Sequence, residues 1–202
     1  AMTSFIKGIC MSQPLRHSDH PIQPQFLERW SPRAFSDQPV GEQELMTLFE
    51  AARWAPSASN LQPWRFIYGL KGEPEFATLL SLLIPFNEGW AKEAAALVFL
   101  ASVTTFDGER PVPTGSFDAG AAWMSLALQA HAQGLVAHGM YGIDFAKAPL
   151  VLGLPDTMKI EAAIAIGHRG DPQSLSETLR AREVPSDRQP LDTMVFKGAF
   201  KS

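Results

Sequence analysis

The hydrophobic positions of the chain follow a helical period in one segment and a strand period in the next. In residues 41–54, GEQELMTLFEAARW, acidic residues occupy the early turns and four apolar positions recur at helical spacing: Leu45, Leu48, Phe49 and Ala52. Residues 64–70, WRFIYGL, alternate in the manner of a strand. We therefore predict a helix that ends before Pro56, then a strand, with residues 55–63 as the connection between them.

Three further segments are mainly apolar. Residues 75–84, EFATLLSLLI, predict a short helix, whereas residues 94–102, AAALVFLAS, and 161–167, EAAIAIG, predict buried strands. The strands of the expected sheet are therefore widely separated along the chain.

The segment 118–134, DAGAAWMSLALQAHAQG, is apolar or small at nearly every position. Asp118 is a candidate N-cap of this helix, and Gly134 lies beyond its end. Because such a helix has no polar face for water, we expect it to be buried on all sides. In a chain this short, the simplest cover is a second subunit.

The polar, proline-punctuated residues 1–24 show no sustained period, so we predict an extended arm there and one domain over residues 25–202. With 202 residues and 46% apolar content, the chain is long enough for a substantial core. The formal net charge of −4 and the scattered lysines and arginines make nucleic acid an unlikely partner class.

The single cysteine, Cys10, excludes an internal disulfide framework and favours a cytoplasmic protein. No run reaches the roughly 20 apolar residues that a membrane span requires, so we expect no membrane partner. The five histidines lack paired ligand spacing, and we expect no metal site. No glycine-rich dinucleotide or P-loop motif occurs, and His138 is interpreted as a packed residue beside a ligand loop.

Two short clusters carry candidate chemistry. PSASN, at residues 56–60, offers small donors for a flat polar ligand, or it is a turn whose serines cap their own backbone. RWSPRAF, at residues 29–35, places two cations and a hydroxyl where Arg29 and Ser31 suit a phosphate, or it is a solvated basic turn. Each cluster alone leaves both interpretations open.

Taken together, the motifs resemble the FMN-dependent nitroreductase family. RWSPRAF matches that family's R-x-S-x-R-x-F motif, and PSASNLQPW matches its P-S-x-x-N-x-Q-P-W motif. PFNEGW, HGMYGID and SDRQPL resemble later segments of the family in the same order, and they bring in Asn87, the 140–142 loop and Arg188. Five matches in sequence order make the resemblance specific, and it runs through most of the chain.

The resemblance implies an α+β fold with a mostly antiparallel sheet flanked by helices, and an intertwined homodimer with FMN sites at the interface. It implies that the 56–60 loop reaches the flavin of the other subunit and that Arg33 lies at the N1 and carbonyl edge. A backbone N–H of the 140–142 loop would bond flavin N5, and no protein nucleophile or general base is required. The implied cofactor-binding residues are Arg29, Trp30, Ser31, Arg33, Pro56, Ser57, Ala58, Ser59, Asn60, Asn87, Met140, Tyr141, Gly142 and Arg188.

The implied activity is ping-pong transfer of hydride from NADPH or NADH, through FMN, to a nitroaromatic, a quinone or a similar small electron acceptor. Two alternatives keep the flavin: another flavin reaction, such as reductive dehalogenation or oxygen-dependent flavin chemistry, and a non-catalytic flavin-binding protein. The chain departs from the family at Trp30, where a basic residue is frequent, and at Trp90, where some relatives place a lysine. Both differences remove possible positive charge and bear on redox tuning.

Overall fold

The computed structural model describes residues 16–106 and 108–200. Most of the predicted arm, including Cys10, lies outside these residues, and residues 16–24 contain neither helix nor strand. The division into an arm and one domain stays a prediction.

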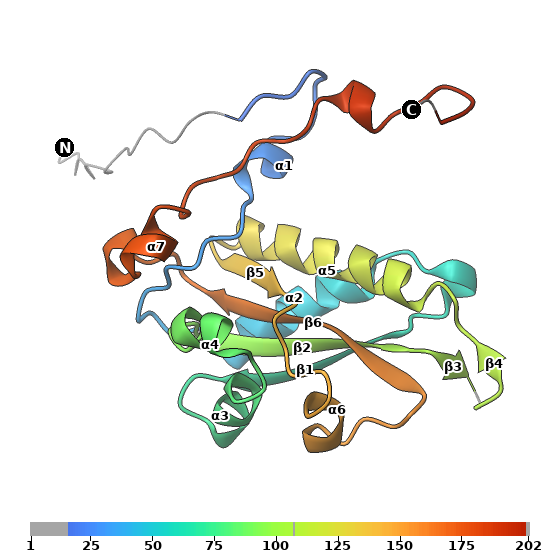
Figure 1. Cartoon of the computed structure of the whole chain (residues 1–202), viewed down its shortest axis with the longest axis horizontal. Helices are drawn as coiled ribbons and strands as arrows, with labels where there is room; N and C mark the ends of the chain where they lie inside the picture. The colour runs from blue at the N-terminus through green and yellow to red at the C-terminus, as the bar shows by residue number, and fades with distance from the viewer. Residues whose placement is uncertain (1–15, 107, 201–202) are drawn as a thin grey trace, which may run out of the picture.

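Four strands form one antiparallel sheet in the order β1-β2-β6-β5 (Figure 1). Their bounds are Trp64–Leu70 for β1, Ala96–Val103 for β2, Val136–Met140 for β5 and Met158–Gly167 for β6. Every residue of β2 is buried, as its continuous apolar run predicts for a central strand. The expected α+β fold with a mostly antiparallel sheet is confirmed.

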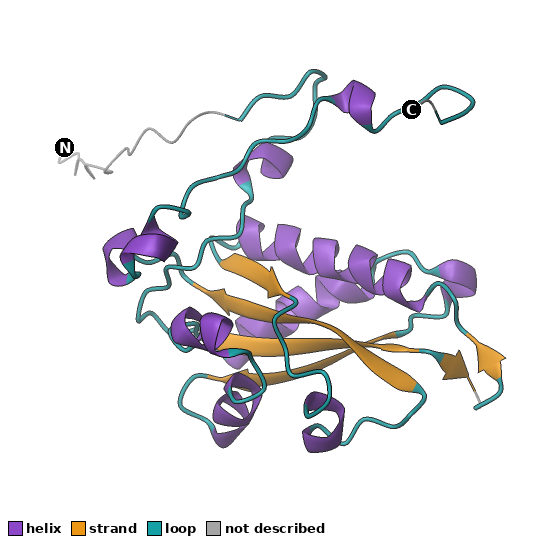
Figure 2. Ribbon diagram, viewed as in Figure 1, coloured by secondary structure: helices purple, strands orange, loops and turns teal. Residues whose placement is uncertain are grey.

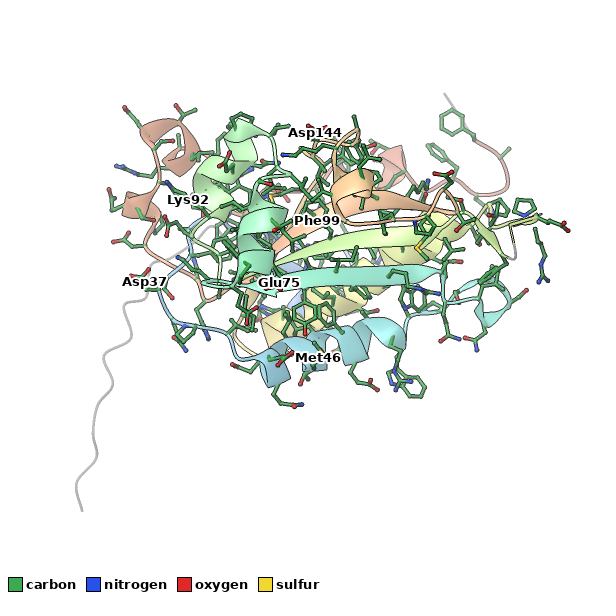
Figure 3. The ribbon with its side chains drawn as sticks, turned by 90° about the horizontal axis from the view of Figure 1, so that it is seen from below. Asp37, Met46, Glu75, Lys92, Phe99 and Asp144 are labelled. Atoms are coloured by element: carbon green, nitrogen blue, oxygen red, sulfur yellow. The ribbon has the colours of Figure 1, made fainter. Side chains whose placement is uncertain are left out.

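Helices cover both faces of the sheet (Figure 2). One layer holds α2 (Glu42–Arg53) and α5 (Gly115–Ala132), which pack on Val98 and Leu100. The other layer holds α3 (Pro74–Leu80), α4 (Pro85–Ala91), α6 (Ala148–Val151) and α7 (Glu177–Arg180). Phe99 points into this second layer, where it is fully buried, and Figure 3 shows it near the middle of the molecule.

The remaining elements are short. Two two-residue strands, β3 (Thr105–Phe106) and β4 (Arg110–Pro111), form a small hairpin beyond β2. A single turn, α1 (Gln25–Glu28), precedes the first motif. Three 3₁₀ turns complete the set: η1 (Ala58–Asn60), η2 (Pro172–Ser174) and η3 (Leu191–Thr193).

Two details of the predicted helices were wrong. The helix expected over residues 75–84 ends at Leu80, and Pro85, which disfavours helical backbone at Ile84, starts the separate helix α4. Asp118 is not an N-cap, since α5 starts at Gly115 after Thr114 and places Asp118 in its first turn. Gly134, with a φ of 75°, follows the helix end as predicted.

Helix α5 is buried on one face only within the single chain. Ala119, Ala122 and Leu126 face the sheet and are at most 1% exposed. The other face carries Phe117, which is 81% exposed, and Met124 and Leu128, which are partly exposed. Burial on all sides was predicted with a second subunit as the cover, and it stays a prediction: within one chain an apolar stripe is left for another surface to cover.

Candidate functional site

The RWSPRAF segment is fixed against the end of β6 and the residues that follow it. Phe35 bridges Arg169, and the backbone N–H of Gly170 donates to the Ala34 carbonyl at 2.8 Å. Gly170 lies so close to this backbone that a Cβ there would overlap Phe35. The GHRGDP residues, 167–172, thus hold the motif against the end of β6.

A carboxylate from the C-terminal part of the chain holds the same segment. Glu183 is 5% exposed, and its Oε1 accepts the backbone N–H groups of Arg33 at 2.7 Å and Ala34 at 2.8 Å. Sequence reasoning missed Glu183, because its partners lie about 150 positions earlier and no local pattern marks it.

His138, on β5, connects the motif to the sheet through a hydrogen bond. Burial, with the nearby Arg33 charge as a smaller cause, lowers the pKa of His138 to about 4, so the ring is neutral at pH 7. Its Nδ1 lies 3.0 Å from the Pro32 carbonyl, which requires Nδ1 to carry the proton and donate. The ring also packs on Trp90, with centroids 4.6 Å apart. These contacts fit the packed role predicted for His138.

A group of arginines lies around Arg29, the first residue of the motif. Arg29 Nη1 donates to Ser31 Oγ at 3.5 Å, and burial and the charge of Arg188 lower the pKa of Arg29. Arg16 joins them, since its Nη1 donates to the Arg29 carbonyl at 2.8 Å. The structure therefore places Arg188 close enough for its charge to act on Arg29, and it adds Arg16, a cation that sequence reasoning missed.

Arg33 lines a hollow of about 550 Å³, together with Trp90, Phe86 and Leu179. Its guanidinium is 5.8 Å from the Trp90 ring, and burial followed by the Arg182 charge lowers the pKa of Arg33. Trp90 is 2% exposed and stacks on Phe35, so it fills the core behind the motif. Trp30 lies under the guanidinium of Arg169, 5.1 Å away.

The loop after β5 packs against the start of α4. Asn87 Nδ2 donates to the Gly142 carbonyl at 3.2 Å, and Ile84 N donates to the same oxygen at 3.1 Å. A Cβ at position 142 would overlap both side chains, so only glycine allows this approach. Met140 is buried, while Tyr141 is 75% exposed. The structure thus brings the predicted residues Asn87 and Gly142 into direct contact, with Met140 and Tyr141 just before Gly142 in the chain.

The PSASN loop is strained and exposed. Three residues that are not glycine have left-handed backbone: Ser59, Asn60 and Gln62, with φ of 49°, 55° and 50°. One buried carboxylate supports the loop, because Asp118 Oδ2 accepts Ala58 N–H at 3.3 Å. Such strain is often found at functional sites.

The two motifs lie at opposite ends of the sheet (Figure 1). Phe35 bridges Arg169, just after β6 ends. Residues 55–63 lead into Trp64, whose register runs across β2 to Lys159 near the start of β6. Lys159 lies eight residues before that strand ends, which is about 26 Å at the usual rise of a strand. Within one chain the structure does not bring the two motifs together.

Neither a metal site nor a membrane span is found in the part of the chain that the structure describes. No group of three or more His, Cys, Asp or Glu residues there could hold a metal ion. Of the helices over residues 16–106 and 108–200, none combines the length and apolarity needed to cross a membrane.

Comparison with known proteins identifies the family. The family model of the nitroreductase family matches residues 27–73 and 84–168. A 15.4 kDa protein from the ask 5′ region of Mycolicibacterium smegmatis is 34% identical over 145 residues, which cover 67% of this chain and 97% of that protein. A Streptococcus pyogenes protein assigned as an NAD(P)H nitroreductase is 25% identical over 209 residues, covering 85% of this chain and 98% of that protein.

A solved structure agrees with these relatives. The crystal structure of an oxidoreductase containing FMN has a TM-score of 0.88 and 47% identity, over 92% of this chain and 96% of that one. The fold and the motifs therefore define a nitroreductase-type α+β protein. The chain belongs to the nitroreductase family, which confirms the resemblance found in the sequence.

Proposed function

We propose that this chain is an FMN-dependent oxidoreductase that takes hydride from NADH or NADPH and reduces a small electron acceptor by a ping-pong mechanism. Its family membership and its FMN-containing structural relative support this function. The observation that carries it is a set of buried guanidinium donors at the first motif, which make no hydrogen bond among the described residues. Buried donors of this kind call for an acceptor that the protein itself does not supply.

The residues present fit FMN at both ends. Nε of Arg29 and Nε of Arg33 are buried without partners among the described residues, and the two arginines flank Ser31 in the sequence. Arg29, Ser31 and Arg188 would hold the phosphate, since charge-assisted bonds to phosphate are strong. Arg33 and Asn87 would bind the pyrimidine edge.

The reactive part of the flavin would meet the loop after β5. Tyr141 and Gly142 follow Met140, the last residue of β5 that pairs with β6, so their N–H groups are not used by the sheet. One of them would donate to flavin N5. Bound FMN supplies hydride transfer, and the protein contributes position and charge.

The second half of the site would come from a second copy of the chain. The PSASN loop lies about 26 Å along the sheet from the first motif, and α5 exposes an apolar stripe that includes Phe117, Met124 and Leu128. A homodimer that covers this stripe would bring one subunit's Pro56, Ser57, Ala58, Ser59 and Asn60 to the flavin of the other. Nitroaromatics and quinones are the proposed acceptors, and a cytoplasmic location stays a prediction.

The test is one anaerobic spectrum taken before and after NADPH, then NADH, is added. The purified protein should be yellow, release FMN on denaturation and lose its flavin absorbance with one donor. Steady-state reduction of a quinone at several donor concentrations should give parallel double-reciprocal lines. A colourless protein that does not bind added FMN would overturn the proposal.

A further inference from the structure

Arg16 lies in a segment without helix or strand, yet its side chain is fixed. Nη1 donates to the carbonyl of Arg29 at 2.8 Å and to that of Leu27 at 3.2 Å. The segment thereby lies on the backbone of the RWSPRAF motif. Figure 1 shows this stretch, in blue, beside the C-terminal segment in red that carries Arg188.

The positive charges of Arg16, Arg29 and Arg188 lie close enough together to affect one another. Burial lowers the pKa of Arg16, and the charges of Arg188 and Arg29 lower it further, while Asp187 opposes them. Burial and Arg188 lower the pKa of Arg29 in the same direction. Three cations held together with one opposing carboxylate are unfavourable unless an anion joins them.

Unused hydrogen-bond donors point to the same anion. Nε of Arg16 and Nε of Arg29 are both buried and have no partner within the described residues. Arg188 Nη1 donates to the carbonyls of Ser186 and Asp187, the two residues directly before it. A phosphate offers three acceptor oxygens and about two negative charges, which matches both the donors and the charge.

We propose that Arg16 is a third cationic ligand of the FMN phosphate, contributed by the segment before α1. This inference rests on the proposed function. Its consequence is specific, because Arg16 would favour FMN over riboflavin, which has the same ring and ribityl chain without the phosphate. The isoalloxazine ring would be held by other residues, and its binding would not depend on Arg16.

The test measures dissociation constants of the full-length apoprotein for FMN and for riboflavin by flavin fluorescence, at one fixed salt concentration. Arg16→Met keeps an apolar stem and removes the charge. It should weaken FMN binding about tenfold, the size expected for one charge-assisted hydrogen bond. Riboflavin binding should change by less than about twofold, because no charge-assisted bond from Arg16 reaches riboflavin.

Lys71→Met is the matched control. Lys71 is an exposed partner of Glu93, so this change removes the same charge from a residue that is not among the cations acting on Arg16 and Arg29. It should leave both dissociation constants at their wild-type values. Arg16→Lys keeps the charge but not the planar fork, and its preference for FMN should lie between that of wild type and that of Arg16→Met.

Two results would overturn the inference while leaving the proposed function intact. One is equal weakening of FMN and riboflavin by Arg16→Met, which would make Arg16 only a support of the backbone. The other is an unchanged FMN constant in both Arg16 variants. A wild-type protein that binds neither flavin would instead remove the proposed function, and this inference with it.

Discussion

The two sequence motifs that suggest a flavin differ sharply in how the fold holds them. The RWSPRAF segment is fixed by Glu183, by His138 and by the residues after β6, and its two arginines each have a buried Nε without a partner among the described residues. The PSASN loop rests on one carboxylate, Asp118, and exposes most of its residues. One end of the sheet, which we call the prebuilt end, therefore holds its motif rigidly, while the other presents a strained loop outward.

This difference shows that residues expected at one ligand need not meet within one chain. Both motifs match the same family, yet the sheet separates them by about 26 Å. The proposed homodimer would resolve this distance, because each chain could offer its loop to the prebuilt end of its partner. The contrast between the two ends can be tested by breaking each one separately.

The largest effect is expected from Glu183→Ala. This change leaves the buried N–H groups of Arg33 and Ala34 without an acceptor, so the free energy of unfolding should fall by about 3 kcal/mol. Glu183→Gln retains an acceptor oxygen and should cost about 1 kcal/mol. Urea denaturation of the apoproteins measures both, and wild-type stability in Glu183→Ala would show that the prebuilt end needs no such support.

Arg33→Ala should change the redox behaviour of the prebuilt end. Losing a cation near the reduced, anionic ring should lower the potential of bound FMN by roughly 30 to 65 mV, which corresponds to about 1.5 to 3 kcal/mol for a two-electron couple. Arg188→Ala is the comparison, since it should weaken FMN binding with less change in potential. Potentiometric titration decides, and an unchanged potential in Arg33→Ala would make Arg33 another phosphate anchor.

Acid should loosen the prebuilt end through His138. Its folded-state pKa of about 4 lies below the ordinary value of 6.5, so the unfolded chain takes up the proton first as the pH falls. The contribution is intact above about pH 6.5 and is lost toward pH 4, with about 1 to 2 kcal/mol lost between pH 7 and pH 5. His138→Gln should remove this part of the pH dependence of urea unfolding. Identical pH profiles for the two proteins would contradict the assignment.

The sequence was sufficient where the signal is local or matches a known motif. The apolar run of β2 predicts a buried central strand, and the five motifs predict the family. It was insufficient where partners are far apart, as for Glu183 with Arg33, or Arg16 with Arg29. Such hydrogen bonds depend on how the N-terminal and C-terminal segments pack in the folded chain, and the local hydrophobic pattern does not predict this packing. Strand β5 was also missed, because its sequence VAHGM is short and interrupted by His138 and Gly139.

The smallest effect should come from the strained loop, and it has the opposite sign. Ser59 has a φ of 49°, where glycine is at ease and other residues are not. Ser59→Gly should relieve roughly 1 to 2 kcal/mol of left-handed strain. Glycine also gives the unfolded chain more freedom, which costs roughly 0.4 to 1 kcal/mol. The variant should therefore be about 0.5 kcal/mol more stable than wild type. Ser59→Ala removes the hydroxyl but keeps Cβ, so it should leave stability unchanged.

Asn60→Gly completes this comparison, since asparagine tolerates the left-handed conformation and little strain remains to be relieved. Urea denaturation of the apoproteins should therefore rank Ser59→Gly above wild type, Ser59→Ala close to it, and Asn60→Gly below it by roughly 0.4 to 1 kcal/mol, the cost of the freer unfolded chain. If the strained backbone holds the loop ready to bind the flavin of the partner subunit, Ser59→Gly should gain stability and bind FMN more weakly. The more flexible loop would then have to be ordered when FMN binds. A loss of stability in Ser59→Gly would mean that the loop holds no strain, and the two ends of the sheet would then differ only in exposure.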